Sequence, residues 1–114
     1  MSYKLYGIPN CNTVKKAKDA LESKGIEFEF VNFKKTPPNK TQLKRWKSFF
    51  QQWPVNRKGP TFRKYKELFD EAGAPQKWEF MIENTSMIKR PILEKKDTVI
   101  AMGYDETVYS KLTS

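Results

Sequence analysis

The first thirty residues contain the pattern that most constrains the fold, a strand, a turn, a helix and a second strand in close succession. Residues 3–6 predict a short strand, and residues 27–31 alternate polar and apolar side chains as a half-buried strand does. Between them, apolar residues recur at helical spacing from Val14, which predicts a helix from residue 11 or 12 to residue 24, stopped by Gly25. Two strands joined by one helix over this length form a right-handed βαβ unit with parallel strands. The segment therefore predicts an α/β fold.

The rest of the chain predicts three or so helices followed by a hairpin and a last helix. Antiparallel strands are expected at residues 92–95 and 98–102, with a tight turn at Lys96-Asp97 and a helix capped near Asp105. The expected order is β-α-β, a helical insertion over about residues 34–85, and β-β-α. The side chains expected to face inward in the insertion are Leu43, Trp46, Phe50, Tyr65, Leu68, Phe69, Ala72, Trp78, Met81 and Ile82.

A length of 114 residues suits a single hydrophobic core. We therefore expect one domain over residues 1–114, with residues 1–33 and 86–114 as its core and the insertion between them. No apolar stretch approaches membrane-spanning length, and the N-terminus carries no apolar signal segment. These observations predict a cytoplasmic protein without membrane contact.

The chain has one cysteine, Cys11, and no histidine. An internal disulfide, a Cys-His pair, a Ser-His-Asp triad and a zinc site built from cysteine and histidine are thereby excluded. We expect no metal and no bound cofactor. Any catalysis must use Cys11, arginine, lysine, carboxylate groups or backbone donors.

Cys11 lies where the first strand and its turn give way to the helix. A thiol there faces unpaired backbone N–H groups and the positive end of the helix dipole, and both favour the thiolate. Because the thiolate is the nucleophilic form, the position indicates sulfur chemistry. A buried, inert cysteine is the alternative, and position alone does not decide between the two.

Positive charge is concentrated in the middle of the chain. From Val31 to Lys66 there are eleven Lys and Arg and no Asp or Glu, so that the rest of the chain carries −2 of a total of +9. Such a segment could attract an anionic ligand, an acidic protein or nucleic acid, or serve only as a solvated surface. The chain has no helix-turn-helix or other nucleic-acid motif, so direct DNA binding is not expected.

Five blocks of sequence, spread in order over nearly the whole chain, carry a family resemblance. They are residues 6–17 (YGIPNCNTVKKA), 25–28 (GIEF), 56–59 (NRKG), 83–94 (ENTSMIKRPILE) and 103–106 (GYDE). Together they resemble the ArsC family of arsenate reductases, including its Spx and YffB branches, with the greatest similarity to YffB. The resemblance implies a thioredoxin-like fold with a mixed four-stranded sheet.

The resemblance also implies roles for particular residues. In the arsenate reductases a cysteine attacks the arsenic oxyanion, arginines hold the anion, glutathione joins the adduct and glutaredoxin resolves it. By motif match Cys11 is the nucleophile, and a cis bond is expected between Arg90 and Pro91. The family's third arginine has no counterpart in Met102-Gly103-Tyr104, which argues against arsenate as the substrate. The predicted anion- or substrate-binding residues are Asn10, Asn12, Thr13, Arg57, Arg90 and Pro91.

We therefore expect a thiol-dependent oxidoreductase with glutathione as the external thiol, because the chain has no second cysteine to resolve a mixed disulfide. The substrate would be a thiol compound or a small oxyanion, and glutaredoxin is a further partner that the family implies. The alternative is an Spx-like transcription regulator or adaptor that binds RNA polymerase. Many Spx proteins carry Cys-x-x-Cys, whereas Val14 occupies the second position here, so an internal disulfide switch is excluded.

Overall fold

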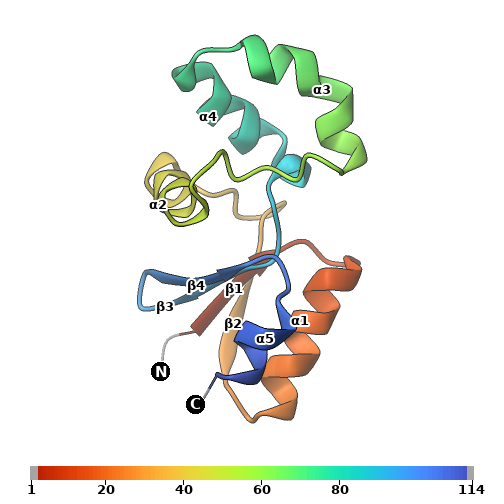
Figure 1. Cartoon of the computed structure of the whole chain (residues 1–114), viewed down its shortest axis with the longest axis vertical. Helices are drawn as coiled ribbons and strands as arrows, with labels where there is room; N and C mark the ends of the chain where they lie inside the picture. Colours follow the sequence, from red (N-terminus) through yellow and green to blue (C-terminus); the bar gives the residue numbers. More distant parts are fainter. Residues whose placement is uncertain (1–2, 113–114) are drawn as a thin grey trace. The chain divides into compact units, whose positions relative to one another are not determined.

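The computed structural model describes residues 3–112 and consists of two compact units (Figure 1). The sheet unit contains the described residues up to Asn32 and from Arg90 onward, and the helical unit is Phe33–Lys89. The elements are β1 (Tyr3–Gly7), α1 (Asn12–Ser23), β2 (Phe28–Asn32), α2 (Lys40–Phe50), α3 (Pro60–Glu71), α4 (Ala74–Glu83), the 3-10 helix η1 (Thr85–Met87), β3 (Ile92–Lys95), β4 (Thr98–Met102) and α5 (Glu106–Ser110).

The sheet unit is built on four strands in the order β2-β1-β3-β4. Strand β1 runs parallel to β2, with Leu5 opposite Phe30, and antiparallel to β3, with Leu5 opposite Leu93. Strands β3 and β4 are antiparallel neighbours. The predicted α/β class, mixed four-stranded sheet and thioredoxin-like order of elements are confirmed.

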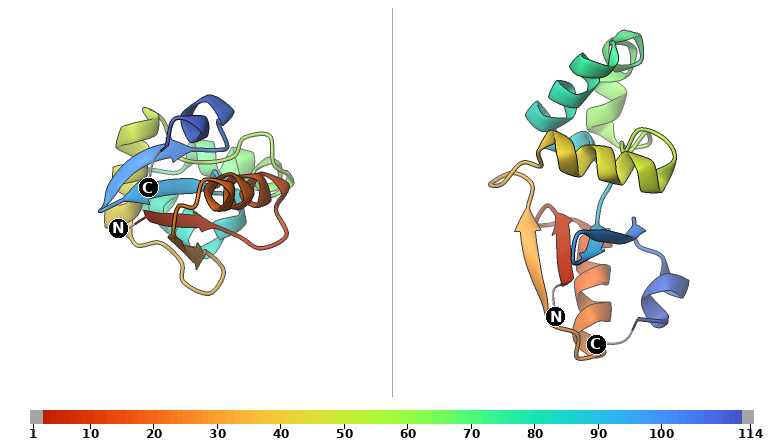
Figure 2. Two further views of the ribbon diagram at one scale, coloured as in Figure 1. Left: turned by 90° about the horizontal axis from the view of Figure 1, so that it is seen from below. Right: turned by 90° about the vertical axis from the view of Figure 1, so that its left-hand side faces the viewer.

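One face of this sheet is covered by α1 and α5 (Figure 2). Apolar side chains from the strands meet the inward face of α1, where Val14, Ala17 and Leu21 are buried at helical spacing. This packing fixes α1 against β1 and so sets the direction of the corner between them. The residues of this core are Tyr3, Leu5, Ala17, Leu21, Ile26, Leu93, Ala101 and Tyr109.

The two turns and the helix cap that were predicted in the sheet unit are present. Gly25 has a φ of 70°, and the N–H of Ile26 donates to the carbonyl of Leu21 at 3.0 Å, which ends α1. Lys96 and Asp97 have φ values of 51° and 64°, the left-handed backbone of a tight hairpin turn. Asp105 caps α5 by accepting hydrogen bonds from the N–H groups of Thr107 and Val108.

The helical unit is held together mainly by aromatic side chains. The rings of Trp53 and Trp78 are 4.6 Å apart, and those of Phe62 and Phe69 are 5.5 Å apart. Leu68, which was expected to face inward, is 65% exposed. Phe62 and Phe69 define the buried face of α3, and Leu68 lies to one side of it.

An isolated antiparallel bridge between Val55 and Ile88 joins the loop between α2 and α3 to the end of this unit. The N–H of Asn56 donates to the carbonyl of Met87 at 2.8 Å, and that of Lys89 donates to Pro54 at 2.9 Å. These bonds fix the backbone of the loop that carries Arg57. No helix within residues 3–112 is both long and apolar enough to cross a membrane.

Candidate functional site

Cys11 occupies the N-cap position of α1, with extended backbone angles (φ −108°, ψ 126°). The preceding residue, Asn10, has a φ of 62°, a left-handed conformation that asparagine tolerates better than most residues. Gly7 lets the corner close tightly, because a Cβ there would lie 2.8 Å from a methyl group of Val14. The turn therefore places the sulfur at the first turn of the helix.

The sulfur of Cys11 is surrounded by hydrogen-bond donors. The Thr13 hydroxyl oxygen lies 3.1 Å from it, and the Arg90 guanidinium is also within hydrogen-bonding reach. Partial burial raises the pKa of the thiol, but this effect is outweighed by hydrogen bonds that lower the pKa. They come from the Thr13 hydroxyl, the Val14 N–H, the Arg90 side chain and the Thr13 N–H. The net result is a pKa below the ordinary value for cysteine, with the side chain half-buried and open to reactants. These are the surroundings of a reactive thiol.

A pocket with a volume of about 410 Å³ opens beside this sulfur. Two of its lining residues are lysines of α1, of which Lys15 pairs with Asp19 at 3.2 Å and Lys18 lies over the ring of Phe30 at 3.8 Å. Lys18 was missed by the sequence reasoning, although its spacing of three from Lys15 places both on one side of the helix. The lining residues are Pro9, Asn10, Cys11, Asn12, Val14, Lys15 and Lys18.

Most of the residues predicted for the site belong to the sheet unit. The Thr13 hydroxyl and the Arg90 side chain are hydrogen-bonded to the sulfur of Cys11, and Asn10 and Asn12 line the pocket. Pro91 is buried and is preceded by a cis bond, as predicted. Its carbonyl accepts a hydrogen bond from Gly103 at 2.7 Å, which joins the residue before β3 to the residue after β4. Among residues 3–112 there is no group of three or more potential metal ligands.

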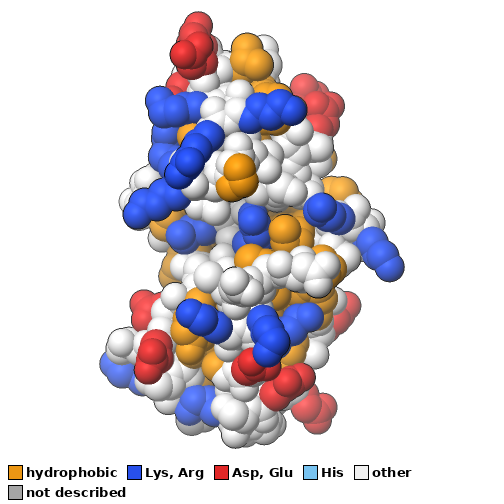
Figure 3. Space-filling model, turned by 90° about the vertical axis from the view of Figure 1, so that its right-hand side faces the viewer, with side chains coloured by type: hydrophobic (Ala, Val, Ile, Leu, Met, Phe, Trp, Pro, Cys, Tyr) orange, Lys and Arg blue, Asp and Glu red, His pale blue; other side chains and the backbone are white. Residues whose placement is uncertain are grey.

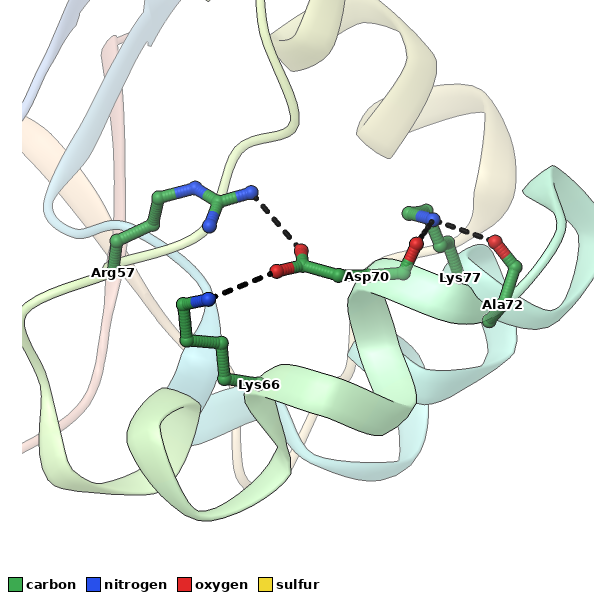
Figure 4. A network of polar contacts seen from close by, with 5 residues as sticks. All are labelled: Arg57, Lys66, Asp70, Ala72 and Lys77. Atoms are coloured by element: carbon green, nitrogen blue, oxygen red, sulfur yellow. Dashed lines mark hydrogen bonds and ion pairs between the residues drawn. The ribbon is translucent and has the colours of Figure 1, made fainter.

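Arg57 belongs to the helical unit, where its guanidinium is engaged by other groups of that unit (Figure 4). Its Nη2 lies 3.2 Å from a carboxylate oxygen of Asp70, and Lys66 lies 3.3 Å from the other oxygen. The guanidinium carbon is 4.9 Å from the centre of the Phe62 ring. A shared role of Arg57 and Cys11 in one site therefore stays a prediction.

The comparisons with known proteins cover almost the whole chain. The sequence model described as the ArsC family matches residues 6–112. The solved structure of the YFFB protein is 32% identical with a TM-score of 0.85, covering 98% of this chain and 99% of that one. An arsenate reductase (ArsC) related protein from Brucella melitensis is 36% identical with a TM-score of 0.73, covering 98% and 97%. The global transcriptional regulator Spx of Streptococcus agalactiae serotype V is 30% identical over 106 residues, which are 90% of this chain and 77% of Spx.

Proposed function

The chain belongs to the ArsC family, and we propose that it is a thiol-dependent oxidoreductase in which Cys11 is the nucleophile and glutathione the external thiol. The observation that carries the proposal is the set of donors around the sulfur, from Thr13, Val14 and Arg90. They stabilise the thiolate, which is the form that attacks disulfides. The sulfur is half-buried, so a substrate can reach it.

The reaction consists of two thiol–disulfide exchanges. In the first, the Cys11 thiolate attacks the glutathione sulfur of a substrate–glutathione mixed disulfide, forms the Cys11–glutathione S–S bond and expels the substrate sulfur as a thiolate. In the second, a glutathione thiolate attacks the glutathione half of the Cys11–glutathione disulfide, releasing glutathione disulfide and the Cys11 thiolate. An external thiol is required because the chain has no second cysteine. Glutaredoxin would offer a second route for resolving the same mixed disulfide.

The proposal also specifies a compartment and a class of substrate. Reduced glutathione is maintained in the cytoplasm, so we place the protein there. Thiol compounds are preferred to arsenate, because residues 102–104 provide no third arginine for an oxyanion. Arg90 and Arg57 are the two guanidiniums assigned to hold an anionic group, through the paired donors that suit carboxylates.

The test is to incubate the protein with glutathione disulfide, identify the adduct by mass spectrometry and measure turnover of a glutathionylated substrate with excess glutathione. We expect one glutathione on Cys11, its release by added glutathione, and loss of both adduct and turnover in Cys11→Ser. Absence of an adduct on the native protein would overturn the proposal. The circular dichroism spectrum of Cys11→Ser serves as the control for folding.

A second candidate function is an adaptor that binds RNA polymerase, and it is favoured by the charge of the helical unit. Phe33–Lys89 contains thirteen Lys and Arg against five Asp and Glu, a net charge of +8, whereas the sheet unit carries nine against eight, a net charge of +1. Figure 3 shows Lys and Arg side chains spread over one face of the helical unit. Such a surface attracts acidic proteins, and the Spx relative is named as a transcriptional regulator.

The two functions are separated by a pull-down with RNA polymerase subunits at increasing salt. If the protein is an adaptor, the native form and Cys11→Ser should bind the polymerase equally well, and neither should show thiol turnover. An oxidoreductase would show turnover that requires Cys11. Retention lost at moderate salt by both variants would indicate only non-specific attraction by the basic surface.

A further inference from the structure

The wall of the Cys11 pocket carries an excess of positive charge. Lys15, close to the first turn of α1, and Lys18, in the middle of the helix, both line the pocket, and the N-terminal end of α1 adds a partial positive charge from the helix dipole. The first turn of α1 contains no acidic residue, and the ion pair with Asp19 balances only Lys15. Arg90 adds a guanidinium at the sulfur. A cation close to this end of a helix, as Lys15 is, costs free energy, and an anion in the pocket would offset that cost.

Lys18 is held in place before any ligand arrives. Its ammonium lies 3.8 Å from the centre of the Phe30 ring, and the side chain is half-buried. A cation fixed over an aromatic face loses little further freedom when it binds a ligand, and an ammonium has three donors to share. Lys15 is more exposed and shares its ammonium with Asp19.

We propose that Lys18, assisted by Lys15, forms an anion subsite in this pocket that selects disulfides and thiols carrying a carboxylate a few bonds from the sulfur. Both lysines line the same pocket as the Cys11 thiol, so one small molecule can present its sulfur to Cys11 and its carboxylate to the ammonium groups. The inference rests on the proposed function and adds the charge of the preferred substrate to it.

The lysines take no part in the chemical step. The Cys11 thiolate attacks a disulfide R–S–S–R, the Cys11–S–S–R bond forms as the R–S–S–R bond breaks, and R–S⁻ leaves with the electron pair. The role of Lys18 is to position the anionic R group and to stabilise it in the bound state. Its removal therefore slows the reaction of anionic disulfides and leaves that of neutral ones unchanged.

The experiment measures second-order rate constants of Cys11 with two chromogenic disulfides at low and high salt. Dithiobis(nitrobenzoate) carries a carboxylate on each ring, and dithiodipyridine is neutral. The variants are Lys18→Gln and Lys15→Gln, with Lys16→Gln as the matched control, because Lys16 is exposed on the same helix and does not line the pocket. Lys18→Arg keeps the charge and tests whether any loss comes from altered packing on Phe30.

At low salt we expect Lys18→Gln to slow the anionic disulfide by about three- to fivefold, with a smaller loss in Lys15→Gln and little change in Lys16→Gln. Lys18→Arg should keep the native rate, and high salt should reduce the differences. Equal slowing by Lys16→Gln and Lys18→Gln would overturn the inference, and so would equal slowing of the neutral disulfide. If Cys11 reacts slowly with both disulfides in the native protein, the proposed function fails as well. If the neutral reaction is fast and Lys18 has no effect, only the subsite fails.

Discussion

Thr13 supplies the side-chain hydrogen bond to Cys11 for which the structure gives a distance, 3.1 Å between the hydroxyl oxygen and the sulfur. Replacing Thr13 by valine keeps the shape of the side chain and removes this donor, so the pKa of Cys11 should rise. Thr13→Ser keeps a hydroxyl and should restore the lower pKa. The measurement is the rate of Cys11 alkylation as a function of pH. Equal profiles for the valine and serine variants would show that the hydroxyl is unimportant.

The lowered pKa of Cys11 also makes a prediction about stability. Because burial is outweighed by the hydrogen bonds, the folded protein favours the thiolate more than the unfolded chain does. The resulting stabilisation is fully present above the unfolded pKa and is lost as the pH falls through the lower, folded pKa. The free energy of unfolding of the native protein, measured in urea relative to Cys11→Ser, should therefore increase with pH across this window. A difference that is flat or decreases would contradict the assignment.

Asp70 is ion-paired with both Arg57 and Lys66. Burial raises the pKa of Asp70, but hydrogen bonds and attraction from Arg57 and Lys66 outweigh it and leave the pKa below the ordinary value. In Asp70→Asn both ion pairs are lost, so Arg57 and Lys66 should bind phosphate more tightly, which isothermal titration calorimetry can measure. Because exposed ion pairs contribute little, the free energy of unfolding should change by about 1 kcal/mol or less. Glu67→Gln, with the same charge change on the same helix, is the control, and identical phosphate affinity in both variants would refute the explanation.

At the scale of elements, the sheet unit was predicted well because its signals are local. Five blocks of sequence gave the ArsC family correctly, and the corner at Cys11, the stop at Gly25 and the hairpin turn follow from nearby residues. The helical unit was harder, because an apolar residue such as Leu68 fits a helical period without being buried.

In the candidate site, too, contacts between residues close in sequence could be predicted, and contacts between remote residues could not be predicted from local patterns. Cys11 and Thr13 are neighbours in the chain, so their contact could be predicted from the turn and the helix start. Arg90 is remote in sequence, and only the family motif pointed to it. Lys18 could not be identified, because a lysine on a helix is usually part of a solvated face, and its position over Phe30 depends on the packing of α1 beside β2.

The stop at Gly25 predicts a measurable cost. Its φ of 70° is left-handed, and a Cβ there would meet no atom within 4 Å, so Gly25→Ala is opposed by the backbone alone. We expect a loss of about 1 kcal/mol in the free energy of unfolding. Gly73→Ala is the matched control, because its φ of −74° suits alanine and the atom closest to its new Cβ would be the flexible end of Gln76 at 3.0 Å. An equal loss in both variants would refute the explanation.

At the scale of the whole molecule, the main asymmetry is the difference in charge between the helical unit (+8) and the sheet unit (+1). Replacing three lysines of α2 by glutamine should lower the salt needed to elute the protein from a heparin column. Removing three exposed lysines of the sheet unit changes the total charge equally and should have a smaller effect, because attraction depends on the local density of charge. Equal shifts would show that only the total matters. The two sets are Lys40, Lys44 and Lys47, and Lys4, Lys96 and Lys111.

The central claim is that this single-cysteine chain acts through a thiolate stabilised at the start of α1. The most direct measurement is the thiolate absorbance of Cys11 as a function of pH, with Cys11→Ser as the blank. We predict that the titration midpoint of the native protein lies below that of an ordinary cysteine. In Arg90→Gln the midpoint should lie above that of the native protein, closer to the ordinary value. A midpoint at or above the ordinary value in the native protein would contradict the account.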